Sequence, residues 1–200
     1  MPKVGSKNSY PKSLKIYVNN YKCRKHSEAI LVQLDVTDRN SIKRALQKSV
    51  DEFGELDLLV NNAGVMVSGT LEELSFEDIE KQLEVNLKGL METTKLALPY
   101  LRESDKGMII NIASGLGKRG SSEASIYSAT KFGVRGFTQS IAEELSPQIK
   151  VKVVNPGMTA TPMTDYRGND PEKVAEVILK TATGEIKART GEDIDVKSYI

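Results

Sequence analysis

From residue 29 onward, short apolar runs alternate with amphipathic segments, and this alternation leaves few possible folds. The apolar runs have the length of strands, whereas the intervening segments repeat apolar residues at helical spacing. The predicted strands span residues 29–36, 56–60, 107–114, 149–157 and 193–200. The predicted helices span residues 38–54, 76–99, 125–146 and 170–182. We therefore expect an α/β fold with a doubly wound parallel sheet between two helical layers.

In a doubly wound sheet, ligands bind beyond the carboxyl ends of the strands. This rule points to four loops, which begin at Asp35, Asn62, Ser114 and Pro156. We expect the candidate site to lie where these loops meet.

Length and composition agree with one soluble domain. The 200 residues are enough for a single core, and 39% hydrophobic with 28% charged residues excludes a disordered or a membrane chain. No segment approaches the roughly 20 apolar residues that cross a bilayer. The N-terminus lacks the apolar stretch of a signal peptide. These features predict a cytoplasmic protein.

Cysteine usage predicts no metal site. Cys23 is the only cysteine, so no disulfide can form within the chain. Cys23 and His26 have the spacing of half a metal site, but a second pair of ligands is absent.

Residues 1–27 carry seven basic side chains and no acidic one. A basic arm of this kind can bind nucleic acid or anionic lipid. Here the basic residues are scattered, and no aromatic stacking pattern accompanies them. We interpret the arm as a solvated tail, with nucleic-acid binding as the alternative.

The stretch "YSATK" places a phenol and an ammonium four residues apart, at Tyr127 and Lys131. Residues four apart share one face of a helix, so the charge of Lys131 lies within reach of the Tyr127 oxygen. A neighbouring cation lowers the pKa of a phenol, which is about 10 in the free side chain. Tyr127 is therefore a candidate proton donor and acceptor. The alternative is that Tyr127 packs in the core beside Ile126 and Phe132.

Three further motifs accompany "YSATK" at strand ends: "NNAG" at residues 61–64, Ser114, and "NPG" at residues 155–157. With these motifs in this order, the sequence resembles the short-chain dehydrogenase/reductase family. The resemblance is close over residues 29–165 and looser over 170–200, which predicts a Rossmann-like domain over residues 29–200 after an atypical basic segment at 1–28. The family resemblance implies NAD or NADP as cofactor.

The resemblance also implies the roles of individual residues. Tyr127 would be the general acid or base, Lys131 would lower its pKa and bind the nicotinamide ribose, and Ser114 would orient the reacting oxygen. Asn86 would hold a water that links Lys131 to solvent. The implied catalytic residues are Ser114, Tyr127, Lys131 and Asn86. The implied cofactor contacts are Asp35, Val36, Asn62, Gly64, Tyr127, Lys131, Thr159 and Thr161.

Several of these residues have a purely structural alternative. Ser114 precedes Gly115 and can be a turn residue. Asn86 interrupts an apolar stripe, where a buried amide needs a hydrogen-bond partner whether or not it relays protons. Asn62 and Gly64 can form a hairpin turn, although no matching antiparallel strand follows.

One family feature is missing. The glycine-rich turn TGxxxGxG, which brings the backbone close to the cofactor pyrophosphate, has no counterpart, because Gly5 is the only glycine before residue 54. We expect the first β-α unit of the fold to be missing or replaced. Residues 14–20, "LKIYVNN", have strand character and are a candidate second or substitute first strand. We hypothesise that the N-terminal segment is not the family's own, through truncation, a shifted reading frame or a misplaced start.

The sequence thus predicts an NAD(P)-dependent oxidoreductase that transfers hydride between an alcohol and a carbonyl, with a small-molecule substrate. The alternative is a catalytically silent binding or scaffold protein with a defective cofactor site. The resemblance also implies a homodimer or homotetramer in which helices 76–100 and 125–146 pack against symmetry mates. We predict no nucleic-acid and no membrane partner.

Overall fold

The computed structural model describes residues 30–200, in which four parallel strands form one sheet in the order β1-β2-β3-β4. The strands are β1 (Leu58–Asn61), β2 (Met108–Ile112), β3 (Lys150–Asn155) and β4 (Asp193–Asp195). β2 and β3 are the longest and lie side by side at the centre, with Ile109 opposite Val151. Their isoleucine and valine side chains favour strands because branched side chains pack well on a pleated surface.

The helices follow the strands in alternation. They are α1 (Arg39–Phe53), α2 (Phe76–Leu83), α3 (Gly89–Arg102), α4 (Ser125–Leu145) and α5 (Pro171–Thr183), with a π-helical turn, η1 (Glu84–Lys88), between α2 and α3. Short 3₁₀ turns are η2 (Gly115–Gly117), η3 (Pro162–Thr164) and η4 (Val196–Ser198). The predicted capping signature is present, since Ser75 and Asp78 form a reciprocal capping box at the start of α2.

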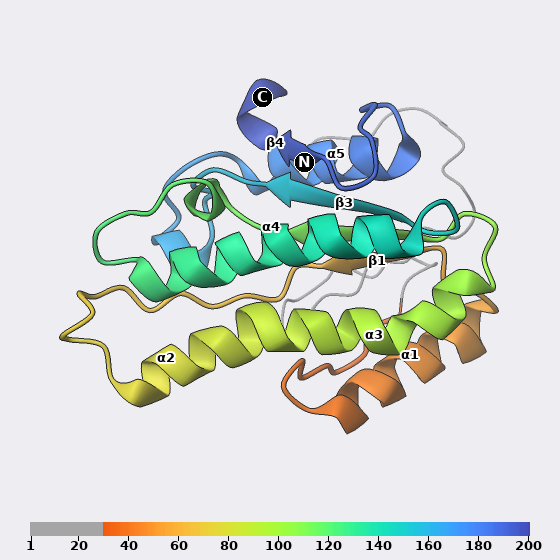
Figure 1. Ribbon diagram of the computed structural model, residues 1–200, viewed down its shortest axis with the longest axis horizontal. Helices are drawn as coiled ribbons and strands as arrows, with labels where there is room; N and C mark the ends of the chain where they lie inside the picture. The colour runs from red at the N-terminus through yellow and green to blue at the C-terminus, as the bar shows by residue number, and fades with distance from the viewer. Residues whose placement is uncertain (1–29) are drawn as a thin grey trace, which may run out of the picture.

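Helices cover both faces of the sheet, as the three-layer prediction requires. On one face, side chains from α1, α3 and α4 pack on Leu59, Ile109 and Val151. On the other face, Val174 and Val177 of α5 pack on Ile110 and Val154. Figure 1 shows α1, α3 and α4 along one side of the sheet and α5 beyond β3 and β4. The Rossmann-like α/β fold with a parallel sheet is confirmed.

Three predicted elements differ from the structure. The predicted strand at residues 29–36 is wrong, because residues 30–35 run without strand pairing. A strand needs a neighbour to share its backbone hydrogen bonds, and within residues 30–200 this segment has none. Instead, Val36 packs on α3 at Gly89, where a Cβ atom would lie 2.8 Å from the Val36 carbonyl oxygen.

The other two differences concern element bounds. The single helix predicted from residue 76 to 99 is divided by η1, and its last part continues to Arg102. The closing strand predicted at 193–200 is only three residues long, because the chain turns into η4 at Val196. The candidate strand at residues 14–20 and the predicted loss of the first β-α unit fall outside the described residues, so both stay predictions.

A buried chain of polar side chains crosses the sheet between α3 and α4. The Asn61 amide donates to Thr94 Oγ1 at 2.9 Å and to Asn111 Oδ1 at 2.8 Å. Asn111 in turn donates to Thr138 Oγ1 at 2.9 Å. Asn61 and Asn111 are register partners on β1 and β2. The network therefore fixes the alignment of two strands with the helices above them.

Replacing Asn111 by alanine is expected to lower the free energy of unfolding by about 2–3 kcal/mol, because Asn61 and Thr138 each lose a partner in a dry environment. Urea denaturation of the purified chain measures the change. Asn40→Ala, at an exposed position in α1, is the matched control and should cost less than about 0.5 kcal/mol. Equal losses in the two variants would show that the network adds no stability.

Candidate active site

A cavity of about 870 Å³ opens at the carboxyl ends of the strands. Its position agrees with the expectation that the loops after the strands form the site. Eight of the ten predicted site residues line it: Val36, Asn62, Gly64, Ser114, Tyr127, Lys131, Thr159 and Thr161. Asp35 and Asn86 are not among the lining residues.

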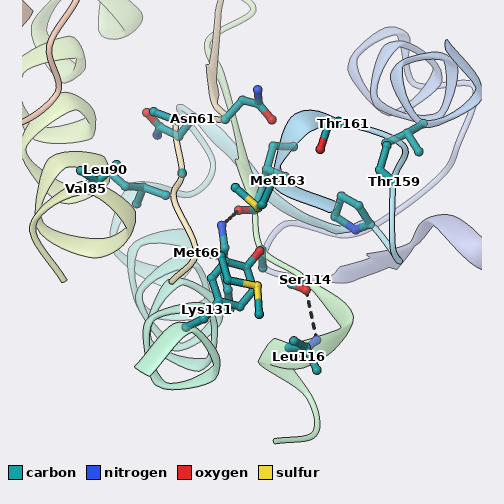
Figure 2. Close-up of a pocket in the computed structure, with 18 of the residues that line it drawn as sticks. Asn61, Met66, Val85, Leu90, Ser114, Leu116, Lys131, Thr159, Thr161 and Met163 are labelled. Atoms are coloured by element: carbon teal, nitrogen blue, oxygen red, sulfur yellow. Dashed lines mark hydrogen bonds between the residues drawn. The ribbon is translucent and has the colours of Figure 1, made fainter. Parts of the chain in front are cut away.

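Tyr127 and Lys131 lie one turn apart near the start of α4, and both are buried. The Lys131 ammonium lies over the Tyr127 ring, with Nζ 5.6 Å from the ring centroid. Lys131 Nζ also donates to the carbonyl oxygen of Ile112, the last residue of β2, at 2.9 Å. Figure 2 shows Lys131 and Ser114 reaching the cavity from different elements. The helix thus brings an ammonium and a phenol to the end of the central strand.

Burial shifts the pKa of both groups. It lowers the pKa of Lys131 from 10.5 to about 8, because the charged ammonium loses its hydration. Burial raises the pKa of Tyr127, and a hydrogen bond with the Ser114 side chain offsets part of that rise. The expectation that Lys131 lowers the pKa of Tyr127 is not met, because the net shift of this pKa is upward. The physical reason is that desolvation of the phenol dominates, while the ammonium faces the ring and the Ile112 carbonyl.

Ser114 lies two residues after the end of β2 and is the N-cap residue of the turn η2. Its hydroxyl oxygen accepts from the Leu116 backbone N–H at 3.1 Å (Figure 2). The Gly115 N–H donates to the carbonyl oxygen of Pro156 at 3.1 Å, which ties this turn to the segment after β3. Ser114 is therefore a turn residue, and its side chain also reaches Tyr127. A role in the turn does not exclude the expected role of orienting a reacting oxygen.

Asn86 lies in η1 and is fully buried. Its amide accepts from the Val65 N–H at 2.7 Å, donates to the Val65 carbonyl at 2.8 Å, and donates to Thr130 Oγ1 at 3.3 Å. A Cβ atom on Gly64 would stand 3.5 Å from Asn86 Oδ1 and 3.8 Å from Lys131 Nζ. Asn86 thus holds the "NNAG" segment beside Lys131. The π-helical turn at this point fits the frequent use of such turns at functional sites.

The Asp35 carboxylate accepts hydrogen bonds from a residue of its own turn. The carboxylate accepts from the Thr37 N–H at 2.9 Å and from the Thr37 hydroxyl at 2.7 Å, and these bonds lower the pKa of Asp35. The adjacent residue, Val36, lines the cavity. A contact between Asp35 and an adenine ring stays a prediction.

Sequence reasoning missed several loop side chains that line the cavity. Met66, Leu116, Met158 and Met163 line it, as does the carboxylate-bearing Glu123. All five lie in the loops after strands or before α4, so the carboxyl-end rule pointed to the loops. Residue spacing within a loop gives no sign of which side chains turn inward.

The cavity lining fits the nicotinamide and ribose part of a dinucleotide. The ammonium of Lys131 and the hydroxyls of Thr159 and Thr161 are suitable partners for ribose and amide groups. Within residues 30–200, Lys131 and Glu123 are the only charged residues that line the cavity. The lining thus provides a single cation, and no glycine-rich helix N-terminus within the described residues joins it to bind a pyrophosphate.

No helix within residues 30–200 has both the length and the apolar character needed to span a bilayer. The Cys23 and His26 pair lies outside the described residues.

The comparisons with known proteins agree with the geometry. The family model described as short chain dehydrogenase matches residues 11–172. The chain is 37% identical over 180 residues to 3-oxoacyl-(acyl-carrier-protein) reductase FabG of Thermotoga maritima, covering 82% of this chain and 73% of that protein. It is 38% identical over 170 residues to a 3-alpha-(or 20-beta)-hydroxysteroid dehydrogenase of Mycobacterium tuberculosis, covering 84% of this chain and 61% of that protein.

Among solved structures, the 3-ketoacyl-(acyl-carrier-protein) reductase from Brucella melitensis, complexed with NADH, superimposes with a TM-score of 0.81 at 26% identity. That alignment covers 86% of this chain and 78% of the other. Among the curated relatives, the alignments with the hydroxysteroid dehydrogenases and with a 3-ketodihydrosphingosine reductase cover less than two thirds of those proteins' length. The match over residues 11–172 and the relatives above 30% identity show that this chain belongs to the short-chain dehydrogenase family.

Proposed function

We propose that the protein transfers hydride between an NAD(P) cofactor and an alcohol or carbonyl substrate, with Tyr127 as general acid or base. The observation that carries this proposal is the meeting of Ser114, Tyr127 and Lys131 at one cavity. The names of the similar proteins, reductase and dehydrogenase, describe the two directions of such a reaction. A cytoplasmic location is proposed on the sequence features alone.

The residues divide the chemistry between them. The nicotinamide, when bound, accepts or supplies the hydride. In the reductive direction, the Tyr127 hydroxyl donates its proton to the oxygen of the forming alcohol while the Ser114 hydroxyl holds that oxygen. Lys131, protonated below about pH 8, offsets the negative charge that Tyr127 acquires. In the oxidative direction the same groups act in reverse.

Titration of the full chain with NADH and NADPH, followed by a screen of carbonyl compounds, tests the proposal. Micromolar binding and turnover are the expected results. Weak or undetectable cofactor binding together with no turnover would favour the silent binding or scaffold protein with a defective cofactor site. The absence of any nicotinamide binding would contradict the proposed cofactor.

Replacing Tyr127 by phenylalanine is expected to lower kcat by about 10²–10⁴-fold, because the variant cannot exchange a proton with the substrate oxygen. The cofactor dissociation constant should stay within about threefold, since the ring is retained. Tyr100→Phe is the matched control, because Tyr100 donates to Gln47 on α1 and does not line the cavity. A Tyr127→Phe enzyme with wild-type kcat would remove Tyr127 from the mechanism.

The buried ammonium of Lys131 predicts a pH-dependent stability. Its folded-state pKa of about 8 lies below the ordinary value of 10.5, so the folded chain loses this proton before the unfolded chain does. The cost of burying the charge is therefore full below pH 8 and disappears as pH rises toward 10.5. Lys131→Met should gain roughly 2 kcal/mol of unfolding free energy at pH 6, and the gain should shrink toward pH 10.

Urea denaturation at both pH values measures this difference. Lys95→Met, at an exposed position of α3, is the control and should show no such pH dependence. A gain of equal size at pH 6 and pH 10 would mean that the lysine charge is not the cause.

We also propose that the chain forms a homodimer or homotetramer through the helices at residues 76–100, which include α2 and most of α3, and through α4, which contacts α2. Phe76 on α2 is 81% exposed and Phe132 on α4 is 44% exposed, and both values are unusually high for phenylalanine. Changing both to serine should weaken self-association by more than about tenfold in sedimentation experiments. Tyr199→Ser, at an exposed tyrosine outside both helices, should have no effect. A wild-type chain that sediments as a monomer would contradict the proposal.

A further inference from the structure

Arg135 lies one turn after Lys131 on α4 and holds the turn that follows Ser114. Its Nη1 donates to the carbonyl oxygen of Gly117, the last residue of η2, at 2.7 Å. Tyr127, Lys131 and Arg135 therefore occupy one stripe of the helix at four-residue spacing. The first two reach the cavity, while the third reaches the back of the turn that carries Ser114.

The guanidinium is fixed from its other side by the sheet. Arg135 Nε and Nη2 donate to the two carboxylate oxygens of Asp193 on β4, at 2.9 and 2.5 Å. The Asn155 amide of β3 also donates to that carboxylate, at 2.9 Å. Both charged side chains are about four-fifths buried, so solvent screens the pair weakly. This two-pronged geometry is specific to arginine, because a lysine offers a single point of donation.

The η2 turn is packed so closely against α4 that a small movement of Gly117 would move Ser114. A Cβ atom on Gly117 would lie 2.8 Å from the Lys131 carbonyl oxygen, so the Gly117 backbone rests directly on the catalytic helix. Within the turn, the Gly117 N–H donates to the Ser114 carbonyl at 2.9 Å, and the Leu116 N–H holds the Ser114 hydroxyl (Figure 2). Displacement of Gly117 therefore displaces Ser114.

We propose that Arg135, anchored by Asp193, is a positioning residue that fixes the η2 turn and thereby holds the Ser114 hydroxyl toward Tyr127. The catalytic consequence rests on the proposed function, whereas the ordering of the turn does not. Arg135 itself does not line the cavity, so it acts through Ser114 and not on the substrate.

The first variant is Arg135→Lys in the full chain. The lysine keeps the charge opposite Asp193 but cannot also reach the Gly117 carbonyl. We expect kcat to fall by about tenfold, since misplacement of a reacting group by about 1 Å can cost up to 10²-fold. The cofactor KM should not change. Arg39→Lys is the matched control, because Arg39 forms an ion pair with Glu92 at 2.6 Å between α1 and α3, away from the turn.

A double-mutant cycle with Ser114→Ala separates positioning from general damage. If Arg135 acts through Ser114, the loss caused by Arg135→Lys disappears once the Ser114 hydroxyl is gone. Losses that multiply in the double variant, or an unchanged kcat in Arg135→Lys, would overturn the inference. Asp193→Asn removes the anchor with little change in shape and should repeat the result if Arg135→Lys does not fold.

Hydrogen exchange of the unliganded chain tests the same inference without turnover. The Leu116, Gly117 and Lys118 amides should exchange at least about tenfold faster in Arg135→Lys, with other segments unchanged. Unchanged exchange in the turn would overturn the inference. A wild-type chain without turnover on any carbonyl compound would sink the proposed function alone, and the exchange result would still decide the role of Arg135.

Discussion

The buried ammonium of Lys131 is the interaction on which the site depends. It donates to the carbonyl at the end of β2, lies over the Tyr127 ring, and stands beside Gly64 of the segment after β1. Removing an ammonium from water is expensive, and the lowered pKa of Lys131 reflects that cost. The rest of the structure must stabilise a helix that carries this charge into the interior. A polar group held where it weakens the fold is typical of functional sites.

The fold was predictable wherever the apolar pattern alone determines the element. β2, β3, α1, α4 and α5 lie where the periodicity indicates, because each buries a continuous stripe or run. Residues 30–36 have an equally apolar pattern but form no strand, since strand formation depends on a partner that the local sequence does not specify. The π-helical turn at Asn86 was likewise not predicted, because the helical periodicity continues through it and the Asn86 contact with Val65 joins residues 21 apart in the sequence.

The candidate site was predictable for a different reason. Family motifs and the carboxyl-end rule predicted ten site residues, and eight of them line the cavity, because both signals depend on topology. The remaining features of the site could be identified only from the three-dimensional structure. Asp35 binds its own turn, Met66 and Met163 turn inward without any signal, and the direction of the Tyr127 pKa shift depends on burial that a four-residue spacing cannot reveal.

The same helix explains how the sheet and the site are held in register. Apolar packing tolerates small shifts of one layer over another, since many arrangements of similar volume have similar energy. Three hydrogen bonds, however, join α4 to the sheet. Lys131 donates to the carbonyl oxygen at the end of β2, Arg135 donates to the Asp193 carboxylate on β4, and Thr138 accepts from the Asn111 amide on β2. Each of these polar contacts has one donor and acceptor geometry, and a shift of α4 along the sheet would break all three together. The residues that align the helix therefore also place Tyr127 relative to Ser114, so the alignment of α4 is a requirement that the fold shares with the proposed chemistry.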